Sequence, residues 1–400
     1  MRPQVSLPIN NIVIEPTKFE LSDSQLGRVR EGLRSELRQG LRLANQEVAV
    51  LPTYLSPAEK QTEGRCLVID CGGTNIRAAV VEFDSKGGFH ISAGPVEAPV
   101  PPSDENTPLS VFLAQHVELV RRLGDVSGLP LGYCFSYPSQ NTEAGDAVLL
   151  KWTKGLQFKN AIGSLIGEKL CDALQAAGIS VPKIKVLNDT VAALFASPVN
   201  AESCSIGLIV GTGFNIAAFA RGEQVSKCPS WPGDLQMAVN LESGNFSPPE
   251  LLSVDDELDT RSRNPNEQKY EKAVSGLYLP QIFRLCCPDL EPDHSAAYLV
   301  RLRDSSSDTI AGKYAGAILK RSAELVASGL AGVVDVFAKP SLDAEMMVNI
   351  SAEGSLFWGD PQYAEQVRNR LESMLGQGYS LNIHKTESAN LIGAARAVLA

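Results

Sequence analysis

A short stretch near residue 70 combines an acid with two glycines at a bend. The segment LVIDCGGTNIRAAVVEF (67–83) is typical of a strand, a tight turn and a second strand, with Asp70 ending the first strand and Gly72 and Gly73 at the turn. Bare backbone N–H groups at such a turn can bind an anion such as phosphate, while the carboxylate holds a metal ion or polarises water. An ordinary hairpin also needs glycine for positive φ, so this stretch alone leaves both interpretations open.

A second stretch further along the chain repeats the pattern. In IGLIVGTGFNIAAFA (206–220) an apolar strand again leads into a glycine-rich bend and a strand, and Gly213 and Asn215 align with Gly73 and Asn75. Two similar hairpins far apart in the sequence suggest a duplicated α/β domain whose turns face one another. Such a pair could hold both ends of a polyphosphate across a cleft.

Further polar residues lie at a predicted corner and at the start of a predicted helix. In IKVLNDTVAALFA (184–196) a buried strand ends at Asn188-Asp189-Thr190, where a helix begins. Strand-to-helix corners of α/β proteins meet ligands, but considered without other motifs Asp189 is better interpreted as a helix N-cap. Gln268 and Glu271 are three residues apart at another helix start and so share one face.

Amphipathic segments separate these candidate sites. Residues 22–41 carry apolar side chains at helical spacing with Ser and Asp available as caps, and residues 109–123, 160–178, 308–334 and 390–400 are also expected to be helical. A strand is expected within 345–357. The proline-rich passage 93–108 is predicted to be a surface loop. Alternating strands and helices indicate an α/β fold.

Composition narrows the class of protein. The 400 residues are 44% apolar and 20% charged, enough for two packed cores, and the net charge of -10 argues against a nucleic-acid-binding surface. No CxxC pair occurs among the eight cysteines, so we expect reduced, mostly buried thiols, and His116 beside an apolar stripe is expected in the core. The N-terminus lacks a signal-peptide pattern and no apolar run is long enough for a membrane span, so we expect a cytoplasmic protein.

Beyond these local signals, the chain resembles the hexokinase and glucokinase family over nearly its whole length. The matching motifs occur in one order, which makes the resemblance highly specific: LPTYL, IDCGGTNIRAAV, FSYPSQNT, LKWTKG, VLNDTVAAL, IGLIVGTGFN, NLESGNF, NPNEQKYEKAVSGLYLPQIFRL and AEGSLF.

This resemblance implies a fold and a reaction. The fold is α/β, with two ribonuclease-H-like (actin-like ATPase) domains, mixed sheets flanked by helices, and a cleft between a small and a large domain. The reaction is ATP-dependent phosphorylation of the 6-hydroxyl of glucose or a related hexose. The protein is expected to be a monomer or a homodimer. The alternative is a sugar-binding sensor or scaffold of the same fold. The implied division is 1–61 packing on the large domain, 62–197 as the small domain, 198–387 as the large domain, and 388–400 returning to the small domain.

The resemblance also implies roles for individual residues. Asp189 would be the catalytic base, Lys154 would supply positive charge beside the transferred phosphate, and Asp70 would contact Mg²⁺, through water. Considered singly, Lys154, Glu242 and Glu271 would be ordinary solvated side chains. The implied sugar contacts are Ser136, Thr153, Lys154, Asn188, Asp189, Asn215, Glu242, Gln268 and Glu271. The implied nucleotide contacts are Asp70, Gly72, Gly73, Thr74, Asn75, Arg77, Gly211, Thr212, Gly213 and Ser355.

Four features depart from the family pattern. Glu353 stands where Asp is usual, Asn266 where Gly is usual, and Ser243 where Trp usually follows the sugar-binding Glu242. The Gly-Ser-Gly run that normally enters the last helix is replaced by ESANLIGAA (387–395), which keeps only its final Gly-Ala-Ala. The backbone near the nucleotide or hinge is therefore the part least defined by the resemblance.

Overall fold

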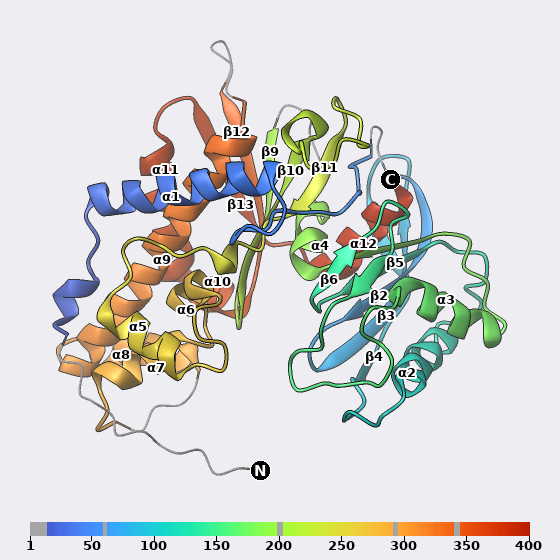
Figure 1. The fold of residues 1–400 in the computed structure, drawn as a ribbon, viewed down its shortest axis with the longest axis horizontal. Coiled ribbons are helices and arrows are strands. Elements are labelled where there is room, and N and C mark those ends of the chain that lie inside the picture. Colours follow the sequence, from blue (N-terminus) through green and yellow to red (C-terminus); the bar gives the residue numbers. More distant parts are fainter. Residues whose placement is uncertain (1–13, 59–61, 198–202, 291–294, 340–344) are drawn as a thin grey trace.

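Two mixed β-sheets with the same strand order organise the chain (Figure 1). The computed structural model describes residues 14–58, 62–197, 203–290, 295–339 and 345–400. The five-stranded sheet has the order β4 (Phe89–Pro99), β3 (Asn75–Phe83), β2 (Gly64–Cys71), β5 (Leu131–Phe135), β8 (Ile184–Leu187). The six-stranded sheet has the order β1 (Leu51–Pro52), β11 (Gln236–Asn240), β10 (Phe214–Arg221), β9 (Ser203–Val210), β12 (Met346–Glu353), β13 (Tyr379–His384).

The sheets share more than their order. Leaving out β1, each sheet runs through two antiparallel pairings followed by two parallel pairings. The two glycine hairpins, β2–β3 and β9–β10, therefore occupy equivalent places. This confirms the α/β fold with a duplicated unit.

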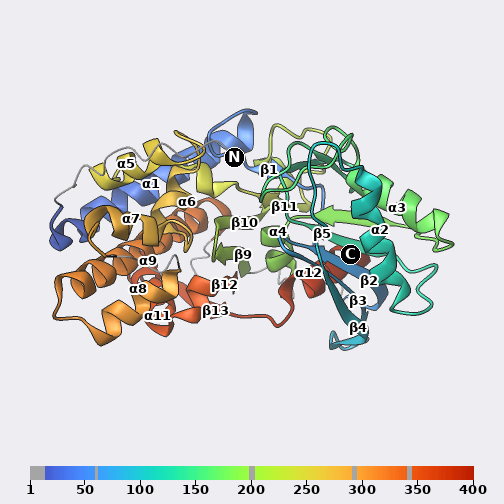
Figure 2. The same cartoon turned by 90° about the horizontal axis from the view of Figure 1, so that it is seen from below.

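The small lobe consists of the five-stranded sheet, the β6 (Ser139–Asn141) and β7 (Ala147–Leu149) hairpin, and the helices α2 (Leu109–Arg121) and α3 (Ile166–Ala176) (Figure 2). Strand β2 is buried on both faces: Leu67 and Ile69 pack in the core beneath α2 and α3, while Cys66 and Val68 pack in a second core on the opposite face. A continuous apolar run is what a strand covered on both sides requires.

The large lobe places helices on the six-stranded sheet. Its helices are α1 (Asp23–Arg42), α5 (Ser253–Arg261), α6 (Lys269–Val274), α7 (Leu279–Cys286), α8 (Ala296–Ser305), α9 (Ile310–Phe337), α10 (Ser355–Gly359) and α11 (Pro361–Leu375). Short 3-10 turns occur at Pro16–Phe19, Gly222–Gln224 and Ser243–Asn245. Helix α1 begins with a capping box at Ser22 and buries Leu26, Val29, Leu33 and Leu37 in the core that also holds α9, which confirms the predicted helix.

Two helices lie between the sheets and connect the lobes. Helix α4 (Asp189–Phe195) leads from β8 towards β9, and α12 (Ala389–Leu399) follows β13 and packs on β2 and β5. The helices touch at Gly393, where an added Cβ would lie 1.8 Å from the carbonyl oxygen of Ala192. The retained glycine of the 387–395 stretch therefore permits this close approach of backbone to backbone.

The prediction of a loop over 93–108 was wrong for its first part. Residues up to Pro99 belong to β4, which pairs with β3 from Asn75↔Pro99 to Phe83↔Phe89 with register shifts near Val80. Strand β4 is at the edge of its sheet. An edge strand tolerates proline because its missing N–H need not serve a neighbouring strand, so the prolines did not prevent a strand here.

Other expectations concern burial and surface charge. His116 is fully buried, with Nδ1 2.8 Å from the carbonyl oxygen of Phe112 and Nε2 3.0 Å from the Tyr133 hydroxyl, which confirms it as a core residue. All eight cysteines are free thiols and six are buried; burial raises the pKa of Cys66 and Cys204 to about 12.

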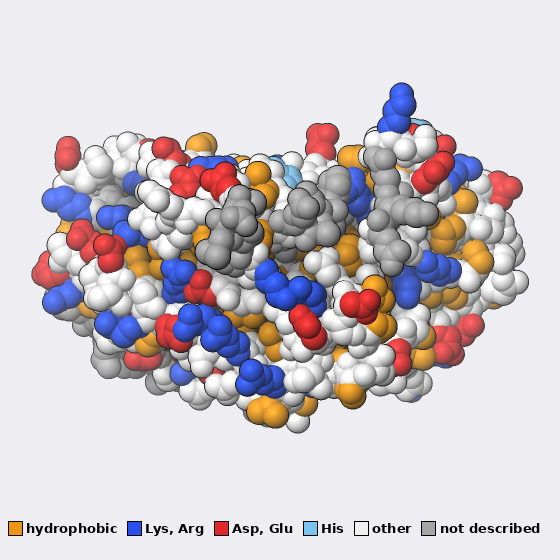
Figure 3. Space-filling view, turned by 90° about the horizontal axis from the view of Figure 1, so that it is seen from above, with side chains coloured by type: hydrophobic (Ala, Val, Ile, Leu, Met, Phe, Trp, Pro, Cys, Tyr) orange, Lys and Arg blue, Asp and Glu red, His pale blue; other side chains and the backbone are white. Residues whose placement is uncertain are grey.

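Charges of both signs are interspersed over the face in Figure 3. Among the described residues, no helix has the length and apolar character needed to cross a bilayer.

Candidate active site

A cavity of about 720 Å³ collects residues from both lobes and from α4. Every predicted sugar contact lines it, although these residues come from segments spread over more than a hundred positions of the sequence. The residues are Ser136, Thr153, Lys154, Asn188, Asp189, Asn215, Glu242, Gln268 and Glu271. The cavity also takes in the predicted nucleotide residues Gly211, Thr212, Gly213 and Ser355.

The corner at the start of α4 separates two roles that the sequence left open for Asp189. Asn188 is the N-cap, since its Oδ1 accepts the backbone N–H of Val191 at 2.9 Å. Asp189 follows as the first helical residue, and its Oδ1 accepts from the backbone N–H and the hydroxyl of Thr190 at 2.8 and 3.3 Å. The capping role therefore belongs to Asn188, and within the described segments Oδ2 of Asp189 has no hydrogen-bond partner.

Lys154 links the cavity to the first glycine turn. Its ammonium group donates to the carbonyl oxygen of Ser136 at 2.8 Å and lies 5.2 Å from the centre of the Tyr137 ring. A Cβ added to Gly73 would lie 2.5 Å from Cδ of Lys154, so the lysine stem runs directly over that turn. The positively charged Lys154 side chain is thereby held between the first glycine turn and the cavity.

Two partly buried acids, Glu242 and Glu271, also line the cavity. Burial raises the pKa of Glu242 and of Glu271, and the charge on Asp189 raises both further. Hydrogen bonds oppose the shift: Asn240 donates to Oε1 of Glu242 at 2.6 Å, and the backbone N–H of Phe214 donates to Oε2 of Glu271 at 2.9 Å. Neighbouring carboxylates and amides suit a ligand with many hydroxyl donors and would repel an anion.

The second glycine turn is held against the segment that follows β12. Gly354 has φ of 123°, and a Cβ there would lie 2.1 Å from the carbonyl oxygen of Val210, so only glycine fits this position. This contact brings the Gly211 turn beside Ser355, the first residue of α10. A smaller cavity of about 490 Å³ continues past Ser355 and is lined also by Glu353, Trp358 and Lys385.

The first glycine turn is adjacent to the cavity but does not line it. The predicted nucleotide residues outside the lining are Asp70, Gly72, Gly73, Thr74, Asn75 and Arg77. Tyr137, which does line it, donates its hydroxyl to the carbonyl oxygen of Gly72 at 2.7 Å. The side chains of Asn75 and Arg77 instead reach Glu97 on β4, at 2.7 and 3.0 Å, because β3 and β4 are neighbours.

Asp70 is a buried carboxylate near the end of β2, beside the first glycine turn. It is 8% exposed; burial raises its pKa, and a hydrogen bond of 3.2 Å from the Asn390 amide to Oδ1 opposes that rise. Within the described part of the chain, no group of three or more His, Cys, Asp or Glu residues could enclose a metal. One carboxylate fits a Mg²⁺ ion that keeps several waters and is held mainly by substrate phosphates.

Sequence reasoning missed several residues that bear on the site. Asn240 and Tyr278 line the cavity, and Asn390 contacts Asp70 from the first turn of α12. Asn240 lies two residues before Glu242 in the same motif, which was a usable signal. Asn390 lies in the stretch that departs from the family pattern, so only its contact across the fold identifies it.

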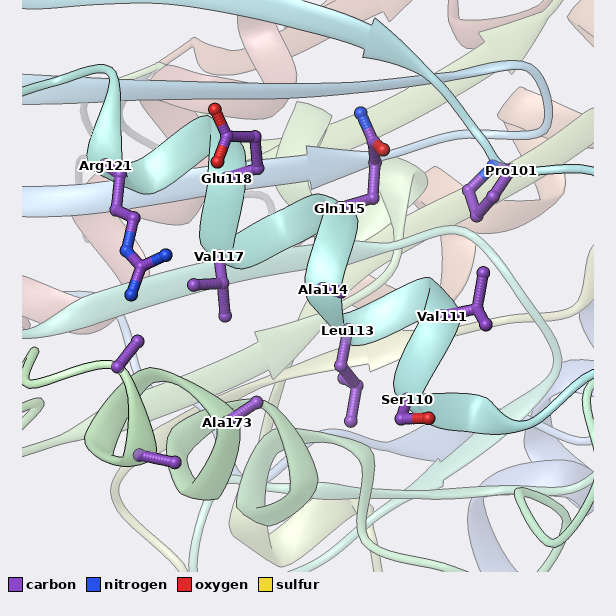
Figure 4. A pocket seen from close by; sticks show the side chains of 12 residues that line it. Pro101, Ser110, Val111, Leu113, Ala114, Gln115, Val117, Glu118, Arg121 and Ala173 are labelled. Atoms are coloured by element: carbon purple, nitrogen blue, oxygen red, sulfur yellow. The ribbon is translucent and has the colours of Figure 1, made fainter.

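A separate groove of about 820 Å³ lies away from these residues. Figure 4 shows Leu113 and Val117 of α2 facing Ala173 of α3 along it. Its lining is mainly aliphatic and contains none of the predicted site residues, so size does not identify the active site here.

Comparison with models of known protein families gives matches over most of the chain. Two family models, both described as hexokinase, match residues 15–199 and residues 205–306 with 293–400. The chain belongs to the hexokinase family. Hexokinases transfer a phosphoryl group from ATP to a hexose, and family membership assigns that activity to this chain.

Individual relatives agree with the assignment. Hexokinase-2 of Candida albicans is 31% identical over 284 aligned positions, with 67% of this chain and 58% of the relative covered. Hexokinase-2 of Solanum tuberosum is 26% identical over 441 aligned positions, with 94% of this chain and 88% of the relative covered. A hexokinase from Schistosoma mansoni, solved with glucose, superposes with a TM-score of 0.78 at 21% identity, covering 96% of this chain and 97% of its own. The last comparison shows a shared fold.

Proposed function

We propose that this hexokinase transfers the γ-phosphoryl group of ATP to the 6-hydroxyl of glucose or a related hexose, forming hexose 6-phosphate and ADP. The observation that supports it is the convergence of the nine sugar-motif residues on one cavity that also contains the Gly211 turn. Carboxylates and amides at fixed positions match the donors and acceptors of a sugar, while backbone N–H groups of a glycine turn match a phosphate.

In this proposal the chemistry occurs at the start of α4. Asp189 accepts the proton of the 6-hydroxyl as that oxygen bonds to the γ-phosphorus, and the bond from phosphorus to the bridging oxygen breaks to release ADP. Asp189 is suited to this role because its Oδ1 is held by Thr190 while Oδ2 has no protein partner among the described residues. Lys154 stabilises the negative charge on the transferring group.

The remaining residues bind and orient. Glu242 and Glu271 accept hydrogen bonds from sugar hydroxyls, and Asn188, Asn215 and Gln268 supply amide groups. Ser136 and Thr153 contribute hydroxyl groups on the small-lobe side. Because a ring carrying several hydroxyls meets fixed partners on two sides, the sugar is held in one orientation with one hydroxyl towards Asp189.

The nucleotide is proposed to lie along the two glycine turns. Gly211, Thr212 and Gly213 would bind phosphates on one side and Gly72, Gly73 and Thr74 on the other, with adenosine beside Ser355. Asp70 would hold the Mg²⁺ of the nucleotide through water, and that ion supplies charge neutralisation for the phosphates. Asn75 and Arg77 would need to exchange their Glu97 partner for the nucleotide.

Sugar binding is further proposed to draw the lobes together. The first glycine turn lies beside the cavity and not in its lining, so a small rotation about α4 and α12 would bring Asp70 towards the γ-phosphate. Closure would also remove water, the competing acceptor, from the cavity.

Replacing Asp189 tests the proposal. Asp189→Asn should lower kcat by about 10²- to 10⁴-fold, as expected for loss of a general base, with glucose binding retained. The measurement is hexose-dependent ADP production across a panel of sugars and phosphoryl donors, together with calorimetry of glucose binding. Asp172→Asn, on the exposed side of α3, is the matched control and should behave as the unaltered chain.

Two outcomes would oppose the proposal. Near wild-type turnover in Asp189→Asn would exclude Asp189 as the base. Glucose binding without any ADP production by the unaltered chain would support the sugar-binding sensor instead.

A further inference from the structure

Asn240, at the end of β11, bridges two of the residues proposed to bind the sugar. Its side chain is 8% exposed and lines the cavity. Its Oδ1 accepts the side-chain amide of Asn215 at 2.7 Å, and its Nδ2 donates to Oε1 of Glu242 at 2.6 Å. The buried amide of Asn240 thus connects the Asn215 donor on β10 with the Glu242 acceptor, which follows β11.

The direction of these hydrogen bonds is set by the backbone. The Oδ1 atom of Asn215 accepts the N–H groups of Ile216 and Ser243 at 2.8 and 3.1 Å. A backbone N–H can only donate, so the amide nitrogen of Asn215 must point to Asn240. Asn240 must then accept with its oxygen and donate with its nitrogen, and Glu242 must accept.

This directionality leaves defined atoms for a ligand. The amide nitrogen of Asn215 carries two protons, of which one goes to Asn240, and Glu242 has one oxygen not used by Asn240. Asn240 also opposes the rise in the pKa of Glu242 that burial and Asp189 cause. The bridge therefore keeps a donor and an acceptor side by side.

We propose that Asn240 is a positioning residue for sugar binding, holding Asn215 as a hydrogen-bond donor and Glu242 as a hydrogen-bond acceptor towards neighbouring polar groups of the sugar. This inference rests on the proposed function, because it assumes that Asn215 and Glu242 bind the sugar. Ser243 takes part from the other end, since its hydroxyl also lies 3.4 Å from Oδ1 of Asn215.

The variant Asn240→Asp tests the bridge with almost no change of shape. The introduced carboxylate still accepts from Asn215 but cannot donate to Glu242, and it places a second negative charge beside that acid. The dissociation constant for glucose should rise about 10- to 100-fold, as for loss of a hydrogen bond to a charged group, while KM for ATP changes less than about twofold.

The pH dependence of this variant separates positioning from a merely structural role. The charged groups acting on Glu242 are Asp189 on α4, Glu271 on α6 and Lys151. In the unaltered enzyme, protonating Glu242 removes an acceptor, so glucose binding weakens as the pH falls. In Asn240→Asp one proton shared by the two acids restores the bridge, so glucose binding should instead strengthen as the pH is lowered from neutral.

Controls make the outcome decisive. Asn382→Asp applies the same change to an asparagine that donates to Asn349 at 3.0 Å on the exposed side of β13, and should leave glucose binding unchanged. If Asn240→Asp does not fold, Asn240→Ala is measured instead and should show the same loss of glucose affinity without the reversed pH dependence.

The inference is overturned if the unaltered chain phosphorylates glucose while Asn240→Asp or Asn240→Ala binds glucose within about twofold of it. It is also overturned if the variants lose affinity for glucose and ATP equally, which is the pattern of a general structural defect. Absence of hexose phosphorylation by the unaltered chain would instead count against the proposed function.

Discussion

The contact between α4 and α12 predicts a large loss of activity from a small change outside the lining of the cavity. In Gly393→Ala the new Cβ would lie 1.8, 2.6 and 2.9 Å from the O, C and Cα atoms of Ala192. Since real Cβ contacts below 3.0 Å essentially do not occur, the helices must separate by at least the difference of 3.0 and 1.8 Å, which is 1.2 Å. Helix α4 begins at Asp189, so this shift reaches the proposed base.

The magnitude follows from that displacement. A misplacement of about 1 Å in a reacting group can cost about 100-fold, so kcat should fall by about that factor. Overpacking should also lower the free energy of unfolding by about 1–3 kcal/mol, more than the gain of about 1 kcal/mol that alanine ordinarily brings to a helix. Coupled measurement of ADP production and urea unfolding tests both quantities.

Gly27→Ala is the matched control for this prediction. Gly27 lies within α1, and an added Cβ there would meet nothing within 4 Å. This variant should be slightly more stable than the unaltered chain and equally active. If Gly393→Ala retained both wild-type kcat and wild-type stability, the argument that the close helix contact positions Asp189 would be refuted.

Three further predictions concern the wall of the site, the proposed cation and the large-lobe core. Glu242→Gln should abolish glucose binding but raise the thermal midpoint of the ligand-free protein at neutral pH. Burial and Asp189 raise the pKa of Glu242 in the folded state, so ionising it costs stability as the pH rises through the raised pKa. Lys154→Met should lower kcat by about 10²- to 10³-fold in steady-state kinetics while glucose still binds in calorimetry, because charge stabilisation is needed mainly during transfer. Asp255→Ala leaves the buried Arg321, 1% exposed, without its partner and should lower the free energy of unfolding by about 3–5 kcal/mol in urea titrations.

Each of these predictions has a clear contrary result. A lower midpoint in Glu242→Gln would mean that the charged form of this acid stabilises the empty site. Unchanged kcat in Lys154→Met would leave the lysine without a role in transfer. Wild-type stability in Asp255→Ala would mean that water or another group satisfies Arg321.

Local patterns predicted most of the regular structure because their causes are local. The apolar spacing and cap of residues 22–41 specify α1 without reference to the rest of the chain. The two glycine hairpins and the long helix around 308–334 were likewise evident. Strand β4 was not predicted because its prolines are compatible with a strand only at the edge of a sheet. The sequence alone does not show which strand lies at the edge.

The candidate site was predicted as a set of residue types and only partly as a geometry. The family motifs name Asp189, Lys154 and the sugar contacts, and all of these line one cavity. They do not reveal that Asn188 takes the capping role that Asp189 could have had, or that Asn75 and Arg77 pair with Glu97. Those facts depend on which neighbours compete for each polar group.

Most elements, the family and the chemistry that the site can carry are evident from the chain alone, because periodicity, caps and ordered motifs are properties of neighbouring residues. How distant segments meet depends on the packing of the folded protein. The 1.8 Å virtual contact at Gly393, the bridge of Asn240 and the hydrogen bond from Asn390 to Asp70 each join residues whose approach is set by packing of whole helices and strands. Close packing fixes such distances to fractions of an ångström, and no local pattern in the chain records them.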